Sequence, residues 1–362
     1  MTIRAASLLT LCLYLVGCAE PSAEKMLENY VSRVSNALDQ PIEFKPNTSA
    51  RLPAFPLRRE RLLEIVPIRE GLLDVLEFRQ CDLLPLISER NSNLGRVMQP
   101  SQQLRYELRF LPALYDCRRQ LMEDQHDNSS IFINRVNEII AHKERELPKL
   151  IWNSIYTSSE MEQQFSLAKT ALPLESQGRI SDIEIALNAF IQISELTQLS
   201  EWPEPKIAKD IETYYEILYR NASGGEWLKS LDWLTYTLNQ VADGIEARLN
   251  RRAVCFNQQP NNQSAIIRNV FLNFYAGELQ PYLSQVHQFG ERWLSGHERI
   301  LKNLPLPDAM QEYQQKVLSK THSHGVWQAY VQARDRHTLA WQQLLNQCGM
   351  LPSAPIVLDD SA

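Results

Sequence analysis

Apolar residues recur along most of this chain at the spacing of an α-helix, and this periodicity constrains the fold more than any other feature. Stripes at positions i, i+3, i+4 and i+7 return from residue 26 to residue 348, whereas sustained alternation of apolar and polar residues is nearly absent. Glycine is also scarce, with 12 in 362 residues. The pattern predicts an all-α protein, an assembly of long antiparallel helices of the helical-bundle type.

The helical pattern is interrupted at two places that divide the chain. Residues 41–68 carry five prolines and predict an irregular connection, with room for short extended pieces such as "LLEIVPI" at residues 62–68. A second interruption, "LPLESQGRISD", lies near residue 175. We therefore predict two helical subdomains, residues 18–174 and 175–349, and a loose tail over residues 350–362. One helix, bent at Pro85, is expected between residues 72 and 87.

The N-terminus has the layout of a bacterial export signal. Arg4 precedes an apolar run of twelve residues, 5–16, which is too short for a permanent span of roughly 20 residues. The following "LVGC" at residues 15–18 matches a lipobox, so we expect removal of residues 1–17 and acylation of Cys18 as a membrane anchor. An ordinary secretory signal with an incidental thiol is the alternative. Because Ala19 rather than aspartate follows Cys18, the outer membrane, on its periplasmic side, is the favoured location.

Four further cysteines remain in the mature chain: Cys81, Cys117, Cys255 and Cys348. An even number in an oxidising compartment predicts two disulfides, and three pairings are possible. We favour the non-crossing pairing, Cys81 with Cys117 and Cys255 with Cys348, because it joins neighbouring helices. Cys81 and Cys117 do not lie at matching heights on their helices unless a bend at Pro85 shifts the register. Buried free thiols are the alternative, and the absence of CxxC spacing disfavours zinc.

No catalytic or cofactor motif survives a check of its spacing. G-x-S-x-G, G-x-G-x-x-G and the P-loop are absent, and His297 lacks the second histidine of H-E-x-x-H. His322 and His324, with His337 on the last helix, come closest to a metal cluster. A solvated loop for the first two and a hydrogen-bonded histidine at the core edge for the third are the favoured interpretations. The sequence predicts no cofactor and no metal site.

Two polar stretches are candidates for binding. A candidate basic surface in the irregular connection consists of Arg51, Arg58, Arg59 and Arg61. These arginines suit phosphate head groups or lipopolysaccharide, with arginines that pair with acids as the alternative. A candidate binding loop consists of Arg90, Asn91, Ser92, Asn93, Gly95 and Arg96. The loop holds more hydrogen-bond donors than a helix hairpin needs, although an internally bonded turn is the alternative. Gly95 suits a left-handed helix cap.

One long run carries a resemblance to a known family. It is "IREGLLDVLEFRQCDLLPLISERNSNLGRVMQPSQQLRYELRFL", residues 68–111, which follows the lipobox and the arginine-rich "PLRRERLL". The run resembles an uncharacterised family of Gram-negative lipoproteins, domain of unknown function 3080. The similarity spans most of the mature chain and is most specific over residues 57–117. It implies lipidation and brings no activity, cofactor or catalytic residue.

These features together predict a lipid-anchored protein of the cell envelope that binds a partner there. The partner is expected to be another envelope protein, a glycan or a lipid. Loss of Arg4 with the signal leaves 36 basic against 43 acidic residues, a formal charge of −7 that disfavours nucleic acid. One alternative is an envelope hydrolase whose acids and histidines meet only in the fold. Another is a structural assembly factor without a small ligand.

Overall fold

The protein is an assembly of α-helices in a computed structural model that describes residues 22–46, 52–68, 72–123, 129–175 and 177–351. Within these ranges no β-strand forms, and an isolated β-bridge joins Phe256 and Gln259. The predicted all-α class is confirmed. No helix in the described part of the chain is both long and apolar enough to cross a membrane.

The first half of the chain places several short helices around one long pair. In chain order they are α1 (Ala23–Leu38), α2 (Arg58–Arg61), α3 (Leu72–Glu77), the 3₁₀ turn η2 (Phe78–Cys81), α4 (Leu84–Asn91), α5 (Asn93–Arg96), α6 (Pro100–Glu123), α7 (Ser129–Tyr156) and α8 (Ser159–Phe165). The backbone between α1 and α3 is irregular wherever it is described, apart from the single turn α2. The predicted proline-rich connection is therefore confirmed.

The second half contains most of the long helices. They are α9 (Gln177–Glu195), the 3₁₀ turns η3 (Leu196–Gln198) and η4 (Lys206–Ala208), α10 (Ile211–Arg220), α11 (Ser223–Leu249), α12 (Asn262–Val270), the π-helix η5 (Phe271–Leu279), α13 (Gln280–Leu301), α14 (Asp308–Val317) and α15 (Val326–Asn346). Pro281 occupies the first turn of α13, directly after the π-helix.

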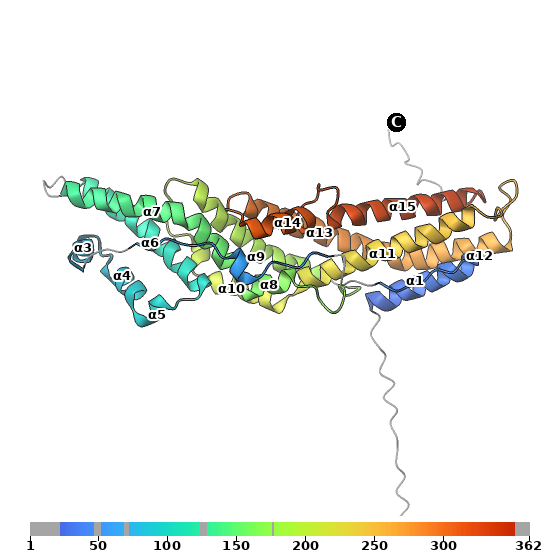
Figure 1. Cartoon of the computed structure of the whole chain (residues 1–362), viewed down its shortest axis with the longest axis horizontal. Coiled ribbons are helices and arrows are strands. Elements are labelled where there is room, and N and C mark those ends of the chain that lie inside the picture. The colour runs from blue at the N-terminus through green and yellow to red at the C-terminus, as the bar shows by residue number, and fades with distance from the viewer. Residues whose placement is uncertain (1–21, 47–51, 69–71, 124–128, 176, 352–362) are drawn as a thin grey trace, which may run out of the picture.

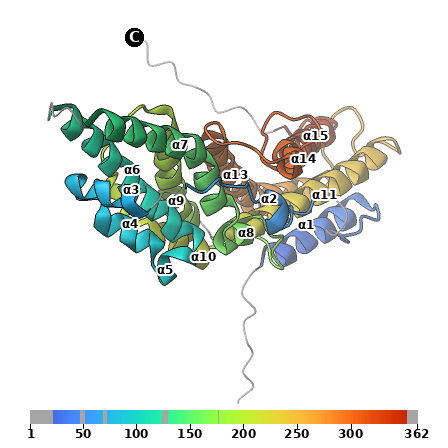
Figure 2. The ribbon, with the colours of Figure 1, turned by 60° about the vertical axis from the view of Figure 1, so that its left-hand side comes forward.

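The molecule is elongated, with most long helices running along its long axis (Figure 1). The pair α6 and α7 forms one end, and α11 packs along α15 at the other. α1 lies at that second end, against α11, α12 and η5, as Figure 2 also shows. The first described helix therefore packs with elements from the far part of the sequence. The predicted division near residue 175 stays a prediction.

The apolar stripe of α1 shows how the helical period becomes packing. Ser22 caps the helix, its hydroxyl accepting a hydrogen bond from the backbone N–H of Lys25 at 3.3 Å. The residues of the stripe recur every three or four positions and all are buried: Met26, Leu27, Tyr30, Val31, Val34, Ala37 and Leu38. The helix ends at Asp39, which has a left-handed φ of 47°. The opposite face is free to be polar.

Tryptophans fill the centre of the molecule. The ring of Trp227 on α11 lies 5.1 Å from that of Trp293 on α13 and 6.2 Å from that of Trp327 on α15, measured between centroids. Gly290 on α13 permits this approach. A Cβ at residue 290 would lie 2.3 Å from Trp327 Cζ3 and 2.7 Å from Trp227 Cζ2. The close packing of the rings therefore requires glycine at this position.

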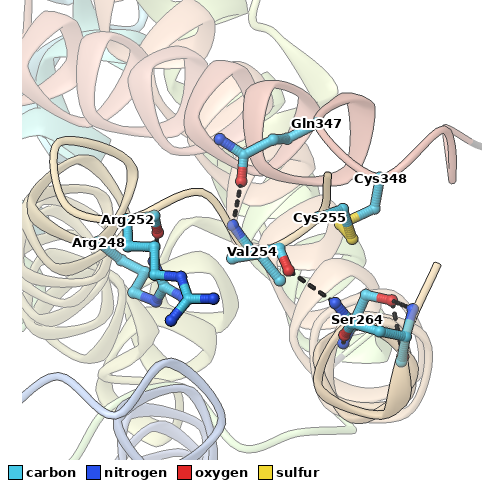
Figure 3. Close-up of a disulfide and its surroundings, with 8 residues drawn as sticks. Arg248, Arg252, Val254, Cys255, Ser264, Gln347 and Cys348 are labelled. Carbon is cyan, nitrogen blue, oxygen red and sulfur yellow. Dashed lines mark hydrogen bonds between the residues drawn. A yellow bond between two sulfur atoms is a disulfide. The ribbon is translucent and has the colours of Figure 1, made fainter. Parts of the chain in front are cut away.

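Two disulfides fasten the ends of the molecule. Cys81 at the end of η2 is bonded to Cys117 on α6, and Cys255 is bonded to Cys348, with Cα atoms 5.1 Å apart in each pair. The predicted non-crossing pairing is confirmed. Figure 3 shows that the second disulfide joins the turn after α11 to the end of α15. There, Val254 N also donates to the side chain of Gln347, at 2.7 Å.

The predicted single helix over residues 72–87 is wrong, because the chain breaks before Pro85. η2 follows α3 and is terminated by Asp82, whose φ is 54°. α4 then starts anew with Pro85 in its first turn, where a missing N–H is tolerated. The break frees η2 from the register of α4. Cys81 can therefore reach Cys117 despite the unequal heights that a continuous helix would impose.

Candidate functional site

An extended segment, residues 62–66, runs along α7, and side chains of that helix bind its backbone. Leu63 N donates to Asn153 Oδ1 at 2.9 Å, and Asn153 Nδ2 donates to Leu63 O at 2.7 Å. Val66 N donates to Glu146 Oε2 at 3.1 Å, and His142 Nε2 donates to Val66 O at 2.8 Å. Polar side chains on one face of α7 thus bind the backbone N–H and C=O groups of the segment, as the backbone of a neighbouring strand does in a β-sheet.

The spacing of these bonds shows that the segment is close to fully extended. Three residues separate Leu63 from Val66, which is about 10 Å in a β-conformation. Seven helical residues separate their partners Asn153 and Glu146, which is also about 10 Å at 1.5 Å per residue. The segment therefore runs antiparallel to α7, and the extended piece expected within "LLEIVPI" is present at residues 62–66.

A groove of about 340 Å³ lies between this segment, the end of α4 with α5, and the helices α6 and α7. We call it the α7 groove. Its lining residues are Ile65 and Val66 from the segment, Pro67 and Ile68 directly after it, Arg90 and Asn91 from the end of α4, Arg96 from α5, Gln103, Glu107 and Leu111 from α6, and His142, Lys143, Glu146, Leu147 and Leu150 from α7. Three of the six residues in the predicted binding loop therefore line a groove.

The other residues of the predicted binding loop shape it. Ser92 caps the single turn α5, its hydroxyl accepting from Gly95 N at 2.9 Å, and Arg90 donates to Gly95 O. Gly95 does not have the left-handed conformation predicted for it. Its glycine is needed for close approach instead, since a Cβ would lie 2.2 Å from Glu89 O. Asn93 begins the turn. The loop is thus internally bonded on one side and open to the groove on the other.

Most charged groups in the α7 groove already have partners. Lys143 Nζ lies 2.5 Å from Oε1 of the buried Glu107. Burial alone raises the pKa of Glu146, but hydrogen bonds from Val66 N–H and Lys149 outweigh it and hold the pKa below its usual value. The exposed Arg96 guanidinium has no partner within the described ranges. The group left free is a donor, so the groove suits a ligand that offers carboxylate, phosphate or peptide carbonyl oxygens.

Exposed apolar side chains lie on the same short turn as this donor. Leu94 on α5 is 82% exposed, and Val97, the residue that ends α5, is 71% exposed. Both flank Arg96 in the sequence. Neither side chain lines the α7 groove itself, but large exposed apolar side chains are typical of protein-contact surfaces. The corner at α5 therefore combines a free cation with apolar contact area.

The predicted basic surface is wrong at Arg61. This side chain is fully buried, donates to Glu162 Oε2 at 2.7 Å, and lies with its guanidinium carbon 3.9 Å from the centre of the Phe55 ring. Pairing with an acid and stacking on an aromatic ring explain its position. Arg58 and Arg59 are exposed, and Arg58 Nε donates to Thr157 O at 3.0 Å. Arg51 lies outside the described residues, and a head-group contact by these arginines stays a prediction.

A second groove, of about 410 Å³, lies beside Arg58. Its lining combines this arginine with hydroxyl groups and with the carboxylates of Glu160, Glu162 and Glu212. Ser154 and Tyr215, two of its lining residues, share a buried hydrogen bond of 2.6 Å between their hydroxyls. Burial raises the pKa of Tyr215, so this hydroxyl stays protonated at neutral pH.

The three histidines considered as a metal or catalytic cluster do not meet. His337 is fully buried on α15, where its Nε2 lies 2.7 Å from the Tyr30 hydroxyl. His322 and His324 lie in the turn before α15, with ring centroids 6.1 Å apart, and roughly 16 Å of helix separates that turn from His337. The hydrogen-bonded histidine is confirmed at His337, although it lies deeper than the core edge. Across the described ranges, no group of three or more His, Cys, Asp or Glu side chains is placed to hold a metal ion.

The residues that position the segment were missed in the sequence. Asn153, Glu146 and His142 lie at separations of seven and four residues, which places them on one face of α7. Polar side chains at helical spacing next to an apolar stripe are the signal that was available. Their partner, an extended segment about 80 residues earlier, was not visible from that spacing.

The chain belongs to the family described as "Protein of unknown function (DUF3080)", whose sequence profile matches residues 27–352. The resemblance to that family is thereby confirmed. No curated protein and no solved structure matches the chain. Fold and family together define an all-α protein with two disulfides from a family of unknown function.

Proposed function

We propose that this protein is a lipid-anchored binding protein of the bacterial cell envelope, and that the α7 groove holds another envelope protein. The observation that carries the proposal is Arg96, which lines the groove, has no partner among the described residues, and lies on the same short turn as the exposed Leu94 and Val97. Arginine is enriched at protein interfaces and among the residues that contribute most of their binding energy.

The proposed location rests on the chemistry of the chain. Two disulfides fit an oxidising compartment, where such bonds form and persist. The lipobox at residues 15–18 supports acylation of Cys18, which lies outside the described residues. Only five residues lead from Cys18 to Ala23 at the start of α1, a reach of about 18 Å at most. The folded body would therefore lie close to the membrane, on the periplasmic face of the outer membrane in our proposal.

Lipid attachment is tested by replacing Cys18. In cells fed a labelled fatty acid, the natural chain should take up label, and Cys18→Ala should lose it and accumulate as an unprocessed precursor. Cys12→Ala, a cysteine within the same N-terminal region, is the matched control and should label normally. Normal labelling of Cys18→Ala would show that this cysteine is not the acylation site.

Partner binding is tested by crosslinking from the groove. A photo-reactive residue at Arg96 of the full chain should capture one defined envelope protein in cells. The control position is Leu339 on α15, which is 54% exposed at the other end of the molecule and should not capture that protein. Equal capture from both positions, or capture of lipid or glycan alone at position 96, would contradict a protein partner in the groove.

A further inference from the structure

The extended segment has two edges, and only the edge toward α7 is bonded. Leu63 and Val66 give both their backbone N–H and C=O groups to α7 side chains. The N–H and C=O groups of Leu62 and Glu64 have no partner in the part of the chain that is described. Successive residues of an extended chain direct these groups to opposite sides. The carbonyl of Arg61 accepts from Trp152 Nε1, so residues 61 and 63 both face α7 and the groups of Leu62 and Glu64 between and after them point away from it. Because Val66 bonds to α7 instead of continuing this alternation, the open edge is confined to Leu62 and Glu64.

The outward-facing side chains of the same segment are largely apolar. Leu62 and Val66 are 51% and 52% exposed, with the exposed Glu64 between them. Leu63 and Ile65, which alternate with them, pack against the hydrophobic core. Glu64 has no ion-pair partner among the residues described. Open strand edges in proteins are usually covered or protected by lysine or proline, and here proline appears only at residue 67, where the segment ends.

We propose that this open edge binds an extended segment of the partner protein by β-strand addition. Backbone donors and acceptors two residues apart match the backbone of another extended chain. The hydrogen bonds with Asn153, Glu146 and His142 already hold residues 62–66 extended, so the receiving edge loses little chain entropy on pairing. This inference rests on the proposed function and deepens it, because the α7 groove shares the residues Ile65 and Val66 with the segment.

The side chains define the partner's chemistry. In a strand pair, facing residues on one side contact each other, and opposite charges or apolar pairs stabilise the contact. We therefore expect the partner residues that face Leu62 and Val66 to be apolar, and the partner residue that faces Glu64 to be lysine or arginine. The partner segment is an extended peptide in which a basic residue stands between two apolar ones at alternating positions.

Crosslinking at successive outward positions tests the pairing. A photo-reactive residue is placed in turn at Leu62, Glu64 and Val66 of the full chain in cells, and the crosslinked partner residue is located by mass spectrometry. Strand addition predicts one partner segment at all three positions, with the attachment point moving by two residues between Leu62 and Glu64, because same-side neighbours in a strand are two apart. Folding of each variant is checked by non-reducing mapping of both disulfides.

A charge reversal supplies the second readout. Glu64→Lys should lower the crosslinking yield from Leu62 about tenfold, because a favourable charge pair becomes a repulsive one across the strands. Glu298→Lys, at an exposed carboxylate on α13, is the matched control and should leave the yield unchanged. An unchanged yield with Glu64→Lys would show that no basic residue faces this position.

The outcomes separate this inference from the proposed function. Crosslinks that lack the two-residue step, or that scatter over several partner segments, overturn strand addition. Capture from Arg96 without capture from the segment means that the groove binds a protein in another way, so only the inference fails. If neither position captures a protein, the proposed function fails as well.

Discussion

Two histidines are fully buried among aromatic rings, and we expect them to make stability depend on pH. The hydroxyl of Tyr30 lies 2.7 Å from His337 Nε2 and accepts a hydrogen bond from Trp341 Nε1 at 2.8 Å. The hydroxyl of Tyr156 lies 3.0 Å from His297 Nδ1. The second ring nitrogen of each histidine is buried without a partner within the described ranges. Burial lowers the pKa of both histidines to about 3.

The sign of the effect follows from the direction of these shifts. In the unfolded chain the pKa of a histidine is about 6.5, so the unfolded state binds protons more tightly than the folded state. Stability is fully present above pH 6.5 and is lost as the pH falls towards 3. Between pH 8 and pH 5 each histidine loses about 2 kcal/mol, and the two together about 4 kcal/mol. Burial also lowers the pKa of His287, which adds a contribution of the same sign.

Urea unfolding of the oxidised protein at pH 8 and pH 5 measures this difference. Most carboxylates titrate below pH 5, so histidines dominate the chosen window. His337→Gln places an amide near the position of Nε2, and His297→Asn places one near the position of Nδ1. Each variant should reduce the pH-dependent loss by about 2 kcal/mol, whatever its stability at pH 8. His324→Gln, at an exposed histidine before α15, should leave the loss unchanged.

The comparison across pH makes the result specific. A variant that is destabilised equally at pH 8 and pH 5 would show only that the histidine packs well. A full loss of about 4 kcal/mol in both His337→Gln and His297→Asn would contradict the assignment of the effect to buried neutral imidazoles. Stability that rises as the pH falls from 8 to 5 would reverse the predicted sign.

Three structural features carry predictions of their own. Opening the Cys255–Cys348 disulfide with Cys348→Ala and Cys255→Ala should lower the free energy of unfolding by about 4–5 kcal/mol, because the bond spans 93 residues; urea unfolding measures the loss. Gly290→Ala should destabilise by about 1–3 kcal/mol despite the better helix propensity of alanine, because its Cβ would overlap two tryptophan rings, and the thermal midpoint should fall. Asn153→Ala should cost about 2 kcal/mol and speed hydrogen exchange at Leu63 N–H roughly 30-fold, because both backbone groups of Leu63 lose their partner.

Local features of the sequence were sufficient to predict the class of fold and several details. The apolar stripe of α1 could be recognised because residues three and four positions apart share one face of a helix, and every residue of that stripe is buried. The prolines of residues 41–68 broke the helix wherever the chain is described, for the equally local reason that proline lacks an N–H. The cysteine pairing was predicted correctly from compartment and chain order, before any contact was known.

The candidate site was predicted only in part. Arg90, Asn91 and Arg96 do line a groove, but the prediction rested on their hydrogen-bond donors. It did not foresee that α6, α7 and residues 65–68 form the rest of that groove. Arg61 was assigned to the surface because arginines usually lie there. Its burial depends on Glu162 and Phe55, and Glu162 is about 100 residues away. The break before Pro85 was placed as a bend, since the sequence alone does not show that Asp82 adopts a left-handed conformation.

The sequence by itself determined which stretches of this protein are helical, where most of the helices stop and which cysteines can join. Only the tertiary structure decided what each helix packs against. α1 pairs with α11 and α12, and α7 binds an extended segment through Asn153, Glu146 and His142. The physical reason is the range of the interactions. Helical periodicity and proline act within a few residues of the chain. The packing contacts and the hydrogen bonds to the extended segment join residues separated by about 80 to 300 positions, which no local pattern encodes.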